Sequence, residues 1–62
     1  MFKTMKSEKA AEDFLNSKGK TFSYMTFKTE LDCNAMAMEF VNKREYVIFV
    51  KVGNAEYKLY LA

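Results

Sequence analysis

Cys33 is the side chain of this sequence that comes nearest to a catalytic group. It lies where a helix is expected to begin, and a helix N-terminus can lower the pKa of a thiol and make it nucleophilic. The sequence contains no histidine, so the usual base that would activate a thiol is missing. We therefore interpret Cys33 as a small buried hydrophobic residue rather than as a nucleophile.

Glu30 and Asp32 are two carboxylates placed two residues apart at an expected strand-to-helix junction. Such a pair can act as acid and base when one member is desolvated. At a strand-to-helix junction, carboxylates more often cap the helix or lie in solvent, and we favour that interpretation. One cysteine without histidine cannot form a zinc site, and two separated glycines do not form a phosphate loop. The sequence thus predicts a protein that is not an enzyme and uses no cofactor or metal.

Residues 45–62 predict a β-hairpin. Gly53 and Asn54 separate two runs of alternating apolar residues, and this dipeptide adopts the positive φ of a two-residue turn at little cost. That turn would place Lys51 opposite Glu56, which is a favourable cross-strand pair. It would gather one largely apolar face, made of Tyr46, Ile48, Val50, Val52, Ala55, Tyr57, Leu59 and Leu61.

Two helices are predicted upstream of the hairpin. The first spans residues 7–18, with Ser7 as N-cap and Gly19 as the residue that ends it. The second spans residues 33–43, and Asp32 or Asn34 is expected to cap it. Each helix has a narrow apolar stripe that would pack on a sheet, Ala10, Ala11, Phe14 and Leu15 in the first and Met36, Ala37, Phe40 and Val41 in the second.

One further strand is predicted over residues 21–30, where Phe22 and Tyr24 share one face and Met25 and Phe27 share the other. Residues 2–6 are either a lead-in or a brief edge strand. We therefore predict an α+β fold in the order α-β-α-β-β, with a three-stranded sheet, in a single domain over residues 1–62.

Composition excludes several classes of protein. The net charge of +2 is too small to indicate nucleic-acid binding by itself. No run of residues has the length and apolarity of a signal sequence or a membrane span, and one cysteine cannot form an intramolecular disulfide. We expect a soluble cytoplasmic protein that does not contact a membrane.

The second face of the hairpin is half apolar, and the two helix stripes are narrow. We therefore expect some apolar surface to stay uncovered and to bind a protein partner or a second copy of the chain. The candidate contact residues are Met38, Val47, Phe49, Lys51, Lys58 and Tyr60. Burial of Val47, Phe49 and Tyr60 beneath a helix is the competing interpretation. We predict a small protein-binding module that inhibits or regulates a larger host protein. The abundance of Lys, Phe, Tyr, Asn and Met is typical of AT-rich genomes, such as those of some bacteriophages.

Nucleic-acid binding is the alternative function. Phe49 and Tyr60 could stack on bases if they were exposed. The basic residues that could hold phosphates are Lys18, Lys20, Lys43, Arg44, Lys51 and Lys58.

Overall fold

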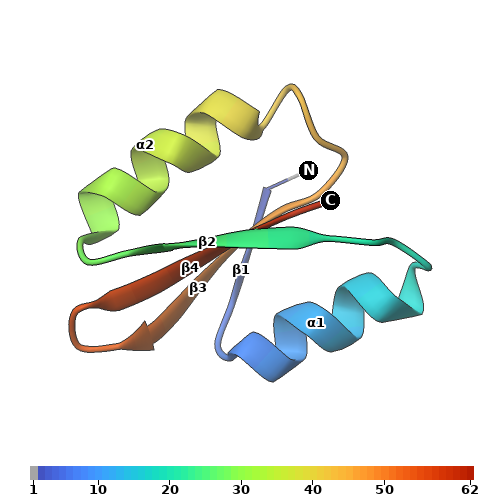
Figure 1. Ribbon diagram of the computed structural model, residues 1–62, viewed down its shortest axis with the longest axis horizontal. Helices are drawn as coiled ribbons and strands as arrows, with labels where there is room; N and C mark the ends of the chain where they lie inside the picture. The colour runs from blue at the N-terminus through green and yellow to red at the C-terminus, as the bar shows by residue number, and fades with distance from the viewer. Residues whose placement is uncertain (1) are drawn as a thin grey trace.

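The computed structural model describes residues 2–62 and shows two helices and four strands (Figure 1). The elements are β1 (Phe2–Met5), α1 (Glu8–Ser17), β2 (Ser23–Phe27), α2 (Glu30–Phe40), β3 (Val47–Gly53) and β4 (Glu56–Leu61). The predicted α+β class is confirmed. The prediction of a three-stranded sheet is wrong, because β1 adds a fourth strand that is too short to show a clear alternation in the sequence.

The strands lie in the order β1-β3-β4-β2, so β1 and β2 form the two edges of the sheet. β1 pairs parallel to β3, whereas β4 pairs antiparallel to both β3 and β2. As a consequence β1, β2 and β3 all start at the same end of the sheet. Both helices therefore run toward that end, where the two chain termini also lie (Figure 1).

The two helices cover opposite faces of the sheet (Figure 1). Successive residues of a strand point to opposite faces, so β3 supplies both cores. On the α2 side the buried residues are Cys33, Ala37, Val47, Phe49, Tyr57, Leu59 and Leu61. On the α1 side they are Ala11, Leu15, Ile48, Val50 and Tyr60.

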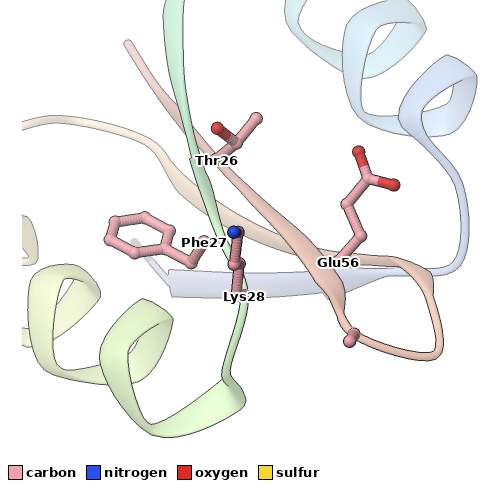
Figure 2. Close-up of a pocket in the computed structure, with 5 residues that line it drawn as sticks. Thr26, Phe27, Lys28 and Glu56 are labelled. Carbon is pink, nitrogen blue, oxygen red and sulfur yellow. The ribbon is translucent and has the colours of Figure 1, made fainter.

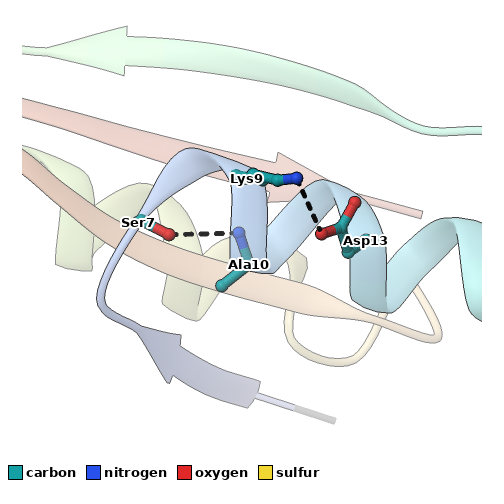
Figure 3. A network of polar contacts seen from close by, with 4 residues as sticks. All are labelled: Ser7, Lys9, Ala10 and Asp13. Carbon is teal, nitrogen blue, oxygen red and sulfur yellow. Dashed lines mark hydrogen bonds and ion pairs between the residues drawn. The ribbon is translucent and has the colours of Figure 1, made fainter.

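α1 begins and ends as the sequence predicts. The Ala10 amide donates a hydrogen bond of 3.1 Å to the Ser7 hydroxyl, which fixes the first turn (Figure 3). Lys9 and Asp13 form an exposed ion pair one turn apart, at 3.9 Å. Gly19 has φ +69°, a left-handed conformation that glycine adopts more readily than any other residue.

α2 begins earlier than predicted. Its N-cap is Thr29, whose hydroxyl accepts a hydrogen bond of 3.2 Å from the Asp32 amide, so neither Asp32 nor Asn34 has the predicted role. The helix ends at Phe40, and in the turn that follows the amides of Lys43 and Arg44 both donate hydrogen bonds to the Phe40 carbonyl. The predicted span of residues 33–43 is therefore wrong by three residues at each end.

The β3–β4 hairpin forms, but its register differs from the prediction by one residue. Val47 pairs with Leu61 and Lys51 pairs with Tyr57, and an irregularity between Lys51 and Gly53 leaves Val52 as an extra residue. Gly53 pairs with Glu56, so the turn lies one residue later than predicted, and Lys51 is not opposite Glu56. The predicted apolar face is accordingly split between the two faces of the sheet.

Candidate functional site

Three of the six residues predicted to contact a partner lie in the core. Val47 and Tyr60 have no exposed surface and Phe49 is 7% exposed. Val47 and Phe49 pack against α2, and Tyr60 packs on the α1 side. The helices thus cover the apolar surface that the sequence predicted to be left open, and these three side chains do not reach the surface of this fold.

Tyr60 takes part in a polar contact that attaches α1 to β4. Its hydroxyl donates a hydrogen bond of 2.8 Å to the Glu12 carboxylate. Burial raises the pKa of Tyr60 well above its usual value, and the bond to Glu12 raises it further. The phenol therefore stays neutral at physiological pH, and we assign it a structural role.

Lys58 lies beside this contact and is also held by α1. Its ammonium group is 2.7 Å from the Glu8 carboxylate and 4.2 Å from the centre of the Tyr24 ring. The hydrogen bond to Glu8 is the main cause that raises the pKa of Lys58. Because its charge is already compensated within the fold, Lys58 is a poor candidate for binding an external phosphate.

Cys33 is fully buried between α2 and the sheet. Burial, with a smaller contribution from the charge of Glu30, raises the pKa of its thiol from 9.0 to about 11. A thiol with such a pKa is almost wholly protonated near pH 7, so it is a poor nucleophile. This agrees with the interpretation of Cys33 as a buried hydrophobic residue.

Glu30 and Asp32 are both exposed in the first turn of α2, so neither carboxylate is buried. Within residues 2–62, no three Cys, Asp or Glu side chains come together as a metal site would require.

The outer face of α2 carries an apolar stripe, of which only Met38 is among the contact residues predicted from the sequence. Leu31, Ala35 and Met38 follow the i, i+4, i+7 spacing that aligns side chains along one face of a helix. Leu31 is 79% exposed and Met38 is 65% exposed, and both lie opposite the core-facing Cys33 and Ala37. α2 is apolar on two opposite sides, which is typical of helices with partners on both sides.

A groove of about 490 Å³ lies beside this stripe, between α2 and the edge strand β2. It is lined by Phe27, Asp32, Ala35, Met36 and Glu39. No Lys or Arg within residues 2–62 lies within 4 Å of the Asp32 or Glu39 carboxylate. The groove thus combines an apolar floor with two carboxylates that lack a cationic partner from the described chain.

A second hollow, of about 340 Å³, lies where β2 ends beside the β3–β4 turn (Figure 2). It is lined by Thr26, Phe27, Lys28, Ala55 and Glu56. Thr26 and Glu56 extend toward the α1 side of the sheet, whereas Phe27 extends toward α2 (Figure 2). The two hollows therefore flank the end of β2 and share Phe27.

The basic residues predicted to hold phosphates are distributed over both ends of the sheet. Lys18 and Lys20 follow α1, and Lys43 and Arg44 follow α2, so these four lie at the end toward which both helices run. Lys20 forms an ion pair with Glu45. Lys51 is exposed near the hairpin turn, away from this group.

Comparisons with protein-family models, with curated proteins and with solved structures gave no significant match. Neither helix in residues 2–62 has the length and apolarity that crossing a membrane requires.

Proposed function

We propose that this protein is a non-catalytic protein-binding module that inhibits or regulates a larger protein, of the kind that bacteriophages encode. The exposed stripe of α2, defined as Leu31, Ala35 and Met38, is the observation that carries the proposal. Leu31 and Met38 are the two most exposed large hydrophobic residues of the described chain. Their alignment on one helix face is typical of a docking surface rather than of scattered exposed residues.

The charges around the stripe favour a partner with a basic surface. α2 contains Glu30, Asp32 and Glu39 and no basic residue, although the whole chain has a net charge of +2. A second copy that docked through the same face would bring two acidic helices together, which opposes association. A surface that is apolar at its centre and basic at its rim matches this face.

Affinity capture from a lysate of the host cell tests this proposal. The unaltered chain is expected to retain one protein in stoichiometric amount, and Leu31→Asp or Met38→Asp is expected to abolish that retention. Asn16→Asp provides a matched control, since it adds the same charge to an exposed position of α1. All three variants replace exposed residues, so the free energy of unfolding of each should lie within about 0.5 kcal/mol of that of the unaltered chain.

Retention of the same protein by both α2 variants would refute the assignment of this face. Recovery of no stoichiometric partner would refute the protein-binding function.

Nucleic-acid binding remains a second candidate because four predicted phosphate-binding residues, Lys18, Lys20, Lys43 and Arg44, lie at one end of the sheet. The buried Phe49 and Tyr60 give it no support, since neither ring is available for base stacking. Titration of labelled single- and double-stranded oligonucleotides distinguishes the candidates. Affinity that falls steeply with salt, and that Lys43→Glu weakens, would favour this second function.

A further inference from the structure

β2 is an edge strand that pairs only with β4. In a strand with one neighbour, alternate residues direct their N–H and C=O groups away from the sheet, where another strand can bind them. β2 has five residues, so two or three of them present such groups. The structure thus offers a template for main-chain pairing beside the α2 groove.

Nothing within β2 protects this edge. Natural proteins block exposed edges with charged residues, prolines or very short strands. Ser23–Phe27 contains no charge and no proline and is rich in residues that favour strands. The opposite edge, β1, has four residues and includes Lys3. β2 is therefore the edge more open to pairing.

The α2 groove suits the side chains of an added strand. Alternate side chains of that strand would point to opposite faces of the sheet. The set on the α2 side would lie next to the groove lined by Asp32 and Glu39, whereas the second hollow lies on the β4 side of β2 and would not be reached. Main-chain hydrogen bonds would supply affinity, and the groove would supply selectivity.

The groove selects the charge of the occupant. Asp32 and Glu39 both line it, and no described cation lies within 4 Å of either carboxylate. Pairing of two β2 edges around a twofold axis would place the two α2 helices side by side, with four carboxylates near the junction. A basic segment from a different protein avoids this repulsion.

We propose that β2 accepts an extended, basic segment of a partner protein as a fifth strand, with a Lys or Arg side chain in the groove between Asp32 and Glu39. This proposal rests on the protein-binding function proposed above and specifies how the partner is recognised.

Selection of random displayed peptides on the full chain is the first test. We expect the enriched peptides to alternate Lys or Arg with β-branched or aromatic residues and to lack proline at their centre. Binding of such a peptide should slow amide hydrogen exchange in Ser23–Phe27. Peptides methylated at one backbone nitrogen at a time should lose at least about tenfold in affinity at every second position only, the signature of strand pairing.

Charge-removing variants test the groove. The double variant Asp32→Asn, Glu39→Gln keeps the shapes of the side chains. It is expected to lower the affinity for the selected peptide roughly tenfold at low salt. Asp13→Asn is the matched control, because Asp13 is an exposed carboxylate on α1. It should leave the affinity unchanged.

Several outcomes would overturn strand addition. Failure to enrich any peptide, enrichment of acidic peptides, and methylation effects without a two-residue period would each do so. So would a dimer of the free chain in sedimentation equilibrium whose β2 amides are protected. A partner that requires Leu31 and Met38 while Ser23–Phe27 exchanges as in the free chain would overturn strand addition and leave the protein-binding function intact.

Discussion

Alkaline pH is expected to destabilise this protein through Cys33. The thiol has a pKa of 9.0 in the unfolded chain and about 11 in the fold, because the fold buries it completely. The unfolded chain therefore loses the thiol proton at lower pH than the folded chain does. The contribution to stability is complete below about pH 8 and is lost as the pH rises from 9 toward 11.

The size of the effect follows from these two pKa values. Between about pH 8 and pH 10.5 the free energy of unfolding should fall by about 2 kcal/mol from this one group. A chain of 62 residues typically has a stability of only roughly 3–9 kcal/mol. Titration of Cys33 alone should thus remove a substantial fraction of the total.

Urea unfolding followed by circular dichroism at several pH values measures this loss, with Cys33→Ala as the comparison. The variant lacks the titrating thiol but keeps Tyr60, Lys20 and Lys58, whose pKa values are also raised and which also destabilise the fold at high pH. The cavity that alanine leaves lowers stability by the same amount at every pH. If both proteins lose stability equally from pH 8 to pH 10.5, burial of the thiol does not raise its pKa and the reasoning is refuted.

Three further substitutions test particular contacts by urea unfolding near pH 7. Tyr60→Phe should cost about 1–2 kcal/mol by removing the bond to Glu12, and much less in a Glu12→Ala background, where no acceptor remains; equal costs in both backgrounds would show that the two side chains do not interact. Gly19→Ala should cost about 1 kcal/mol because of its positive φ, and an unchanged midpoint would contradict that conformation. Thr29→Ala should cost about 1 kcal/mol and Asn34→Ala less than about 0.5 kcal/mol; the reverse order would restore Asn34 as the cap.

The sequence predicts α1 well because local signals determine it. Ser7 and Gly19 mark its two ends, and both act through backbone contacts within a few residues. α2 is harder to place because Thr29, Asp32 and Asn34 are all good capping residues. Which of them becomes the N-cap depends on where β2 ends relative to the sheet. The local sequence pattern does not specify that position.

The hairpin register could not be derived because both faces of the sheet are buried. When one face is exposed, a shift of one residue turns apolar side chains to water and is strongly disfavoured. Here Val47–Val50 is apolar on both faces, and β4 supplies Tyr57 and Leu59 to one core and Tyr60 to the other. Either register buries apolar surface, so alternation does not choose between them, and the turn alone was a poor guide.

The same double burial explains why three of the six predicted contact residues lie in the core. Val47, Phe49 and Tyr60 lie under helices, because one helix packs on each face. Met38 lies off the core stripe of its helix and is exposed, as its spacing predicts, whereas the exposure of Leu31 was not predicted because the predicted helix began after it.

The two helices cover both faces of the sheet, but the outer side of α2 keeps an apolar surface that no other helix of the described chain covers. The core needs one side of α2, but Leu31 and Met38 lie on its opposite side, and residues 2–62 contain no element that reaches them. Exposed apolar residues on a helix add nothing to the stability of an isolated small protein, and an unguarded strand edge exposes it to aggregation. The stripe of α2, the acidic groove and β2 adjoin one another, so a single partner could cover all three. Binding of one partner explains why these three features lie side by side, whereas three unrelated features would have no reason to be adjacent.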